Sequence, residues 1–470
     1  MVKTKARLTE GPIFIRLFLF TVPIMLSSLL QVAYNMVDSI IVGQYSGDEL
    51  ALAAIGSTGA LTSLLVNMLM GVATGAGVVI AQYYGARDSE GVSKSVHTTM
   101  TFSIVSGLTL AVFALLLSSP ILTWMNTKDE LFSRALLYFQ IICVGIPATT
   151  IYNFGNASLR SVGDSKTPLY ALILSSVIHV ILSILFVAVW GLGIAGVAWA
   201  TVISQYISAV LVIVTLFVRR GESYTLSVKK LIINGKILAR SLRYGLPTAL
   251  QTSLFSLSNV IITAAANDKL TIAMLTARTP GGQIDNLVYA MMDAYTYSTM
   301  TFVAQNYGAK EGGRIKKGML IALIQVLIVG VGFGQIITAI SPFLAELFIA
   351  ADATNRAEVI AETVNLVTFF LSVYWMCGLM NTLSGILRGL GYPTAPTVIA
   401  ITGVCGLRII WIYFFYYPIE ELHSLIGLYM CYPITWVFCV PAMAIALAII
   451  WKKVKPQLAE AKEVREKQAA

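Results

Sequence analysis

The chain has 470 residues, of which 57% are hydrophobic and only 12% carry a charge. Soluble globular proteins carry about 25% charged residues, so this composition excludes a chain of soluble domains. A net charge of +9 would suggest nucleic acid as the partner of a soluble protein, but in a membrane protein such an excess sets orientation, and no nucleic-acid partner is expected. The five cysteines show no metal-ligand spacing and are interpreted as packing residues. We therefore predict an integral membrane protein.

Charge-free stretches of bilayer-spanning length follow one another along the chain. The first lies between Arg16 and Asp38 and lacks the cleavage pattern of a signal peptide. The 52 charge-free residues between Lys166 and Arg219 suffice for two spans that turn at Trp190–Gly193. We predict an all-α integral membrane protein with twelve transmembrane helices, which cover approximately residues 14–42, 50–83, 95–119, 133–157, 167–189, 193–218, 243–266, 283–306, 317–342, 357–387, 394–416 and 423–451.

The basic residues support this count through the positive-inside bias. With a cytoplasmic N-terminus, the inner connections hold 25 of the 32 Lys and Arg residues, and the outer connections hold four. A missed helix would invert every later connection, so the asymmetry favours twelve spans. We expect a multi-pass protein of the cell's inner (plasma) membrane with both termini in the cytoplasm.

The two halves of the chain share motifs at nearly constant spacing. Each pair repeats the same residue types at equivalent helix positions, at offsets of 223, 228 and 224: IAQYYGAR at 80–87 with VAQNYGAK at 303–310, LRSVG at 159–163 with LRGLG at 387–391, and Pro23 and Asn35 with Pro247 and Asn259. These matches indicate a duplicated six-helix unit.

Six spans per half is an even number, so both halves enter the membrane from the same side as a parallel repeat. The sequence predicts two pseudo-symmetric six-helix lobes around a central cavity. The expected parts are an N-lobe at 1–218, a cytoplasmic linker at 219–242, a C-lobe at 243–451 and a charged cytoplasmic tail at 452–470. An alternating-access transporter needs this symmetry, whereas a single-channel pore or a membrane enzyme does not.

With these motifs the chain resembles the multidrug and toxic compound extrusion (MATE) transporters over nearly its whole length. The resemblance rests on VDSIIVG at 37–43, the Ala-Gln and Gln-Asn pairs before the two YGA turns, the Leu-Arg-x-x-Gly repeats and GIAGVA at 193–198. It implies two six-helix lobes and the export of an amphipathic, often cationic, organic molecule in exchange for Na⁺ or H⁺. It also implies that the acid of the first helix, here Asp38, belongs to the cation site of the N-lobe.

Two predicted helices carry the candidates for cation coupling. Asp38 follows Asn35 by three residues, which puts a carboxylate and an amide oxygen on one face. A buried carboxylate needs a partner or a role, and this pair suits Na⁺ at Asp38 as well as a proton. Where relatives have an Asn and an Asp on the fifth helix, this chain has His179 and Ser183. Imidazole is a poor Na⁺ ligand that titrates near neutrality, so the difference favours proton coupling, with structural hydrogen bonds as the alternative for both Asp38 and His179.

A polar and aromatic stripe on the eighth predicted helix is the candidate for substrate binding. Asp285, Tyr289, Met292 and Asp293 follow helical spacing, and aromatic rings, thioethers and a carboxylate suit organic cations. We expect Tyr289, Met292 and Asp293 to contact substrate, together with Asn259 of the seventh helix. The alternative is that these side chains fill gaps between helices.

The remaining residues indicate how such a protein would work. Pro23 and Pro247 lie inside the first and seventh helices, where proline permits bending, so both are candidate conformational residues. No acid lies between Tyr244 and Asn267, so a second cation site on the seventh helix is not expected. The chain has no Walker loop and no paired catalytic carboxylates, so we expect no enzyme activity, no cofactor and no metal site beyond the Na⁺ alternative.

The sequence therefore predicts a secondary active antiporter that exports small amphipathic, cationic organic compounds in exchange for H⁺ or Na⁺. We expect it to act as a monomer whose partners are its substrate and membrane lipid. One alternative is a lipid-linked oligosaccharide flippase of the same superfamily, which the scarcity of intramembrane cations, chiefly Arg408, counts against. The other alternative is a passive channel.

Overall fold

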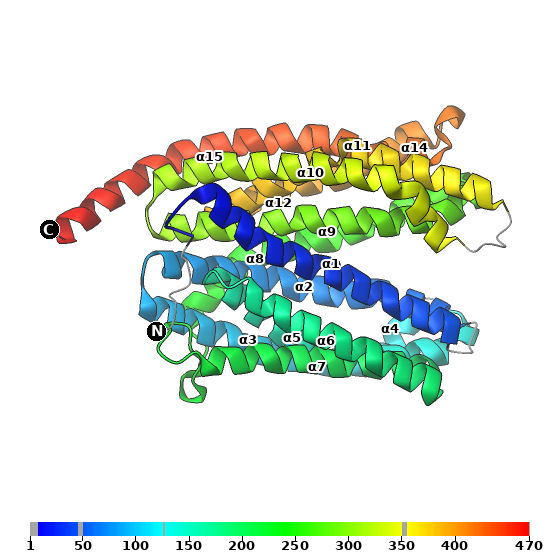
Figure 1. The fold of residues 1–470 in the computed structure, drawn as a ribbon, viewed down its shortest axis with the longest axis horizontal. Helices are drawn as coiled ribbons and strands as arrows, with labels where there is room; N and C mark the ends of the chain where they lie inside the picture. The colour runs from blue at the N-terminus through cyan, green and yellow to red at the C-terminus, as the bar shows by residue number, and fades with distance from the viewer. Residues whose placement is uncertain (1–7, 46–49, 126, 350–354, 470) are drawn as a thin grey trace. The chain divides into compact units, whose positions relative to one another are not determined.

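The computed structural model describes residues 8–45, 50–125, 127–349 and 355–469, which are almost entirely helical and contain no strand (Figure 1). The first half consists of α1 (Ile13–Tyr45), α2 (Ala51–Gly85), α3 (Ser89–Leu116), the short α4 (Ser118–Trp124), α5 (Asp129–Ser161), α6 (Lys166–Ile184), the π-helical η1 (Leu185–Val189) and α7 (Gly193–Val218). The second half consists of η2 (Val228–Lys230), α8 (Gly235–Lys269), α9 (Ile272–Gly308), α10 (Gly312–Phe348), α11 (Arg356–Gly389), α12 (Thr394–Ala400), the π-helical η3 (Ile401–Gly406), α13 (Leu407–Trp411), η4 (Ile412–Tyr416), η5 (Glu420–Leu422), α14 (Leu425–Tyr429) and α15 (Cys431–Ala469).

The predicted all-α membrane architecture is confirmed. Within the described residues, 11 helical segments are long and apolar enough to cross a bilayer. The one predicted span outside these segments is the eighth, 283–306, which corresponds to α9, a helix of 37 residues with a more polar sequence. Its predicted start at 283 was wrong, because the helix begins at Ile272, after Thr271 accepts a hydrogen bond from the Met274 N–H at 3.3 Å. The charge of Arg278 made residues 272–282 resemble a connection in the sequence. In the structure Arg278 lies within the helix, where its guanidinium donates hydrogen bonds to Tyr429 and Thr263.

The predicted turn between the fifth and sixth spans is also confirmed. Gly191 and Gly193 have φ values of +66° and +55°, in the left-handed region that favours glycine. The turn folds α7 back along α6, and the two helices pack against each other. Residues at equal distances from the turn therefore lie at the same level.

The chain forms two compact units. The first contains Leu26–Leu250, and the second contains Leu8–Met25 and Gln251–Ala470. The boundaries fall within α1 and α8, shortly after Pro23 and Pro247, respectively. Each half of the chain therefore contributes the first part of its opening helix to the unit formed mainly by the other half, which the predicted lobe limits did not include.

Small residues explain why the beginning of α8 belongs to the first unit. Gly71 of α2 faces Ala249 of α8, and Gly75 faces Gly245. On each helix the two small residues are four positions apart. A Cβ atom added at Gly71 would lie 2.5 Å from the Ala249 Cα, so the two backbones nearly touch. Small residues at this spacing allow close helix packing inside membranes.

The repeated YGA motifs form the same turn in both halves. Arg87 and Lys310 follow them with φ values of 60° and 63°, the left-handed conformation that ends each helix. The N–H groups of Asp88 and Glu311 then bond back to the Tyr83 and Asn306 carbonyls at 3.1 and 3.0 Å. The sequence repeat is thus a repeat of backbone structure.

The glutamine of each motif anchors the segment that leads into an opening helix. Gln82 Oε1 accepts a hydrogen bond from Arg240 Nη2 of α8 at 2.6 Å, within the first unit. Gln305 Oε1 accepts one from the Leu8 N–H, just before α1, at 3.2 Å, within the second unit. Both glutamines are buried. The motif thus fixes where α8 and α1 start.

Candidate functional site

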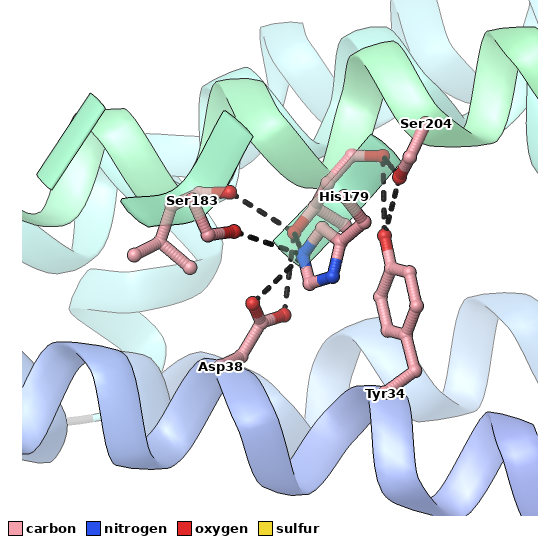
Figure 2. A network of polar contacts seen from close by, with 7 residues as sticks. Tyr34, Asp38, His179, Ser183 and Ser204 are labelled. Atoms are coloured by element: carbon pink, nitrogen blue, oxygen red, sulfur yellow. Dashed lines mark hydrogen bonds and ion pairs between the residues drawn. The ribbon is translucent and has the colours of Figure 1, made fainter. Parts of the chain in front are cut away.

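The predicted coupling residues meet inside the first unit, where α1, α6 and α7 converge. His179 of α6 and Thr201 of α7 each lie 11 residues from Trp190, so the hairpin brings them to the same level. The Asp38 side chain of α1 reaches His179 (Figure 2) and also contacts Thr201.

The central contact joins a carboxylate to an imidazole. Asp38 Oδ1 lies 2.8 Å from His179 Nε2, and Thr201 Oγ1 lies 3.3 Å from Asp38 Oδ2. Ser183, one turn beyond His179, places its Oγ 3.2 Å from the same Nε2 (Figure 2). The structure therefore brings together three of the four residues predicted for cation coupling. The side chain of the fourth, Asn35, lies outside the described residues.

A tyrosine covers the imidazole. The ring of Tyr34 stacks on that of His179 with centroids 3.7 Å apart and an interplanar angle of 17°. Its hydroxyl lies 2.5 Å from Ser204 Oγ of α7. This stack fixes the imidazole plane and keeps Nε2 directed at Asp38 (Figure 2).

Burial limits how many protons the Asp38–His179 pair can carry. The His179 side chain is fully buried, whereas that of Asp38 is 15% exposed. His179 Nδ1 is buried and has no hydrogen-bond partner among the described residues. A proton on Nδ1 would therefore lack an acceptor, which favours a neutral imidazole beside an ionised Asp38. In this form the pair carries one negative charge, and one added proton neutralises it.

Asp38 opens onto a polar cavity of about 290 Å³ within the first unit. Among the described residues, the lining of this cavity contains no Lys or Arg, and Asp38 is its one acid. Amides and hydroxyls supply most of the other polar groups: Gln31, Asn67, Asn153 and Gln205, with Tyr34, Thr62, Ser63, Tyr138, Thr149, Tyr152, Ser175, Thr201, Ser204 and Ser208. Such a lining can solvate an organic cation and leaves the carboxylate as the charge that attracts it.

Several of these residues were missed from the sequence although a signal was present. Tyr34 precedes Asp38 by four residues and therefore shares its helix face. Thr201, Ser204 and Ser208 follow one another at spacings of three and four, a polar stripe in the otherwise apolar α7.

Comparison with known proteins shows to which family the chain belongs. The family model described as MatE matches residues 23–185 and 247–414. The chain belongs to the MatE family, the MATE transporters. The two matched segments confirm the repeated halves.

Relatives extend the match over most of the MatE chain. It is 29% identical over 446 residues to the probable multidrug resistance protein YoeA of Bacillus subtilis (strain 168), with 93% of each chain covered. It is 22% identical over 404 residues to the multidrug export protein MepA of Staphylococcus aureus (strain MSSA476), with 83% of this chain and 85% of the relative covered. A crystal structure of MATE in complex with MaL6 has a TM-score of 0.87 at 20% identity, covering 98% of this chain and 100% of that chain. The protein is thus a multi-pass transporter of a multidrug efflux family.

The predicted substrate residues of this MatE protein lie in different surroundings on α9 of the second unit. Tyr289 is 41% exposed, and Asp285 and Asp293 are half-buried. Met292 instead is fully buried, with its Sδ against Gly330 of α10. The expectation that Met292 contacts substrate gains no support from this packing and stays a prediction.

Asn259 of α8 is also engaged within the second unit. Its Oδ1 accepts a hydrogen bond from Arg408 Nη1 at 3.0 Å and lies 3.4 Å from the Tyr432 hydroxyl. The Arg408 guanidinium is buried and lies 3.9 Å from the centroid of the Tyr432 ring. Asn259 thus holds an arginine in place here, and the predicted substrate contact gains no support from this arrangement.

Proposed function

We propose that this MatE transporter is an antiporter that exports amphipathic organic cations in exchange for protons through the Asp38–His179 pair. The contact of 2.8 Å between these residues, at the wall of a cavity without basic side chains, is the observation that carries the proposal. We further propose that it acts as a monomer in the plasma membrane with both termini cytoplasmic.

The site favours H⁺ over Na⁺ as the coupling ion. Na⁺ needs several oxygen ligands, but the nearest polar atom to Asp38 Oδ1 is the imidazole Nε2 of His179. Displacing it would remove the shortest polar contact of a buried imidazole whose Nδ1 has no hydrogen-bond partner among the described residues. A proton needs only one atom of the pair to accept it.

Competition for one negative charge couples the two fluxes. While Asp38 is ionised, the cavity attracts a cationic substrate. When a proton neutralises the pair, that attraction is lost and the substrate is released. Because proton and cation compete for the same charge, their exchange is obligatory. We propose that bending of α1 at Pro23, and of α8 at Pro247, accompanies the change.

The lining of the cavity also argues against the two alternative functions, a lipid-linked oligosaccharide flippase and a passive channel. A lipid-linked oligosaccharide carries a pyrophosphate, which would lack a cationic partner in this lining. A passive channel needs no titrating pair. The antiporter is therefore the function that the first unit supports best.

Gradients imposed separately on liposomes test the coupling ion. Purified protein is reconstituted, and transport of tetraphenylphosphonium is followed under a pH gradient or a Na⁺ gradient of equal size. We expect uphill transport under the pH gradient alone. Transport driven only by Na⁺ would contradict proton coupling, and flux that never exceeds equilibrium would indicate a passive channel.

A further inference from the structure

The connection between α7 and α8 packs against the first unit. Tyr224 and Leu226 are buried in its hydrophobic core. His97 of α3 accepts a hydrogen bond at Nε2 from the Ser227 N–H at 3.0 Å, and its Nδ1 donates to the Ser93 carbonyl at 2.7 Å. The connection therefore has a defined shape beside the first turns of α3.

A cavity of about 860 Å³ lies between this connection and α3. Thr98 limits one side, because its hydroxyl donates to the Ile232 carbonyl at 3.5 Å and accepts from the Asn234 N–H at 3.1 Å. Charged side chains line the opening: Lys94, Lys229 and Lys230, with Glu90 and Glu222. Glu90 pairs with Lys94 at 2.6 Å, which compensates one of the lysines.

The other two lysines have no partner among the described residues. The side chains of Lys229 and Lys230 make no ion pair or hydrogen bond with any residue that the structure describes. They sit on a single turn, η2, at the edge of the cavity. Two unpaired ammonium groups that line the same cavity can attract an anion to it.

Exposed apolar side chains flank these lysines. Val228 is 72% exposed and Ile232 is 70% exposed, on a connection that is otherwise mostly polar or charged. The connection starts where α7 ends, at Val218, and lies beside the start of α3, at Ser89. Since both helices are membrane spans, this level corresponds to the lipid headgroups.

We propose that the cavity between α3 and the connection binds the phosphate headgroup of an anionic phospholipid. Lys229 and Lys230 contact the phosphate, and Val228 and Ile232 enter the acyl boundary beside it. The apolar pair argues for a lipid rather than a soluble phosphate compound, because a water-soluble ligand gives no reason to expose these side chains. The site is independent of the ion that drives transport.

Native mass spectrometry of the full-length protein in detergent tests the site directly. Phosphatidylglycerol and phosphatidylcholine are titrated separately, and the bound fraction is measured. A basic residue near an anionic lipid surface contributes about 1 kcal/mol, so K229A/K230A should bind phosphatidylglycerol about 30-fold more weakly. Binding of phosphatidylcholine should not change, and K229R/K230R should retain the affinity of the wild type.

Matched variants separate this site from general basic attraction. Lys316 and Lys317 form an exposed pair at the start of α10 that does not line the cavity, so K316A/K317A should leave phosphatidylglycerol binding unchanged. V228S/I232S should weaken binding although every charge is kept. Equal binding by K229A/K230A and the wild type would overturn the proposal. Complete displacement of the lipid by millimolar inorganic phosphate would overturn it as well, in favour of a soluble anion.

Discussion

The two halves of this transporter carry different polar pairs at corresponding places. In the first unit, Asp38 faces the imidazole of His179 at 2.8 Å. In the second, Asn259 holds the guanidinium of Arg408 at 3.0 Å. An imidazole can gain or lose a proton in the physiological range, whereas a guanidinium stays charged. Of the two pairs, only the first can exchange a proton, and the second supplies a fixed positive charge.

The correspondence follows from the internal repeat. Asn35 and Asn259 are 224 residues apart, and His179 and Arg408 are 229 apart. The two family matches likewise start 224 residues apart and end 229 apart. The π-helical η3 lies directly before the helix of Arg408, and a π-helical turn accommodates an additional residue. The repeat thus matches Arg408 to His179 and Asn259 to Asn35, one turn before Asp38, so the two pairs use the same two helices of the repeat with different chemistry.

Replacing Asp38 should have the largest effect on transport and so tests the difference between the two units most strongly. Asp38→Asn keeps a hydrogen-bonding group between His179 and Thr201 but cannot accept the proton, so pH-driven efflux should fall about 100-fold or more. Efflux from reconstituted liposomes measures this loss. Asp268→Asn, which removes an acid at the end of α8, should leave efflux unchanged. Wild-type pH dependence in Asp38→Asn would remove the coupling role from the first unit.

The imidazole should matter less than the carboxylate. His179→Gln retains a hydrogen-bond donor for Asp38 but does not titrate, so pH-driven efflux should fall about tenfold. The same liposome assay applies, at several internal pH values. His423→Gln serves as the control, because His423 lies on the connection before α14 in the second unit and does not contact the pair. If His179→Gln matches the wild type at every pH, Asp38 acts alone.

The fixed charge of the second unit should affect stability rather than coupling. Arg408→Gln loses a charged hydrogen bond and a cation–π contact, which should lower stability by about 2 kcal/mol. Thermal unfolding in detergent measures that change. The ratio of pH-driven to gradient-free efflux should stay as in the wild type. Loss of that ratio would show that the second pair also takes part in coupling.

The smallest effect is expected for the tyrosine over the imidazole. Tyr34→Phe keeps the stack on His179 but loses the hydrogen bond to Ser204, a change of about 1 kcal/mol or a few-fold in efflux. Tyr206→Phe, which loses a hydrogen bond to the Val144 carbonyl instead, is the matched control for efflux. A larger loss in Tyr34→Phe than in His179→Gln would assign the proton to the tyrosine.

Much of the fold could be predicted from the sequence, because hydropathy and the placement of Lys and Arg are dictated by the bilayer itself. The start of α9 could not be predicted, because a charged residue such as Arg278 indicates a connection between spans unless its hydrogen-bond partners on other segments are known. Local spacing also could not show that Met292 is buried in the core. It and Asp293 are neighbours about 100° apart around the helix, so the core can take one while the other stays half-buried.

The site was predictable in its chemistry but not in its extent. Asp38 and His179 stood out because a carboxylate and an imidazole are costly inside a membrane. Thr201 and Ser204 did not stand out, because hydroxyls in apolar helices commonly bond to their own backbone, as both of these do. Their second role, toward Asp38 and Tyr34, depends on contacts between residues more than 160 positions apart.

Proton release on substrate binding tests the central claim most directly. Tetraphenylphosphonium is added to purified protein in weakly buffered detergent solution, at a pH where the pair is partly protonated, and the pH change is recorded. Competition for one charge predicts that up to about one proton is released for each cation bound, and none from Asp38→Asn. Cation binding that releases no proton from the wild type at any pH would contradict the account.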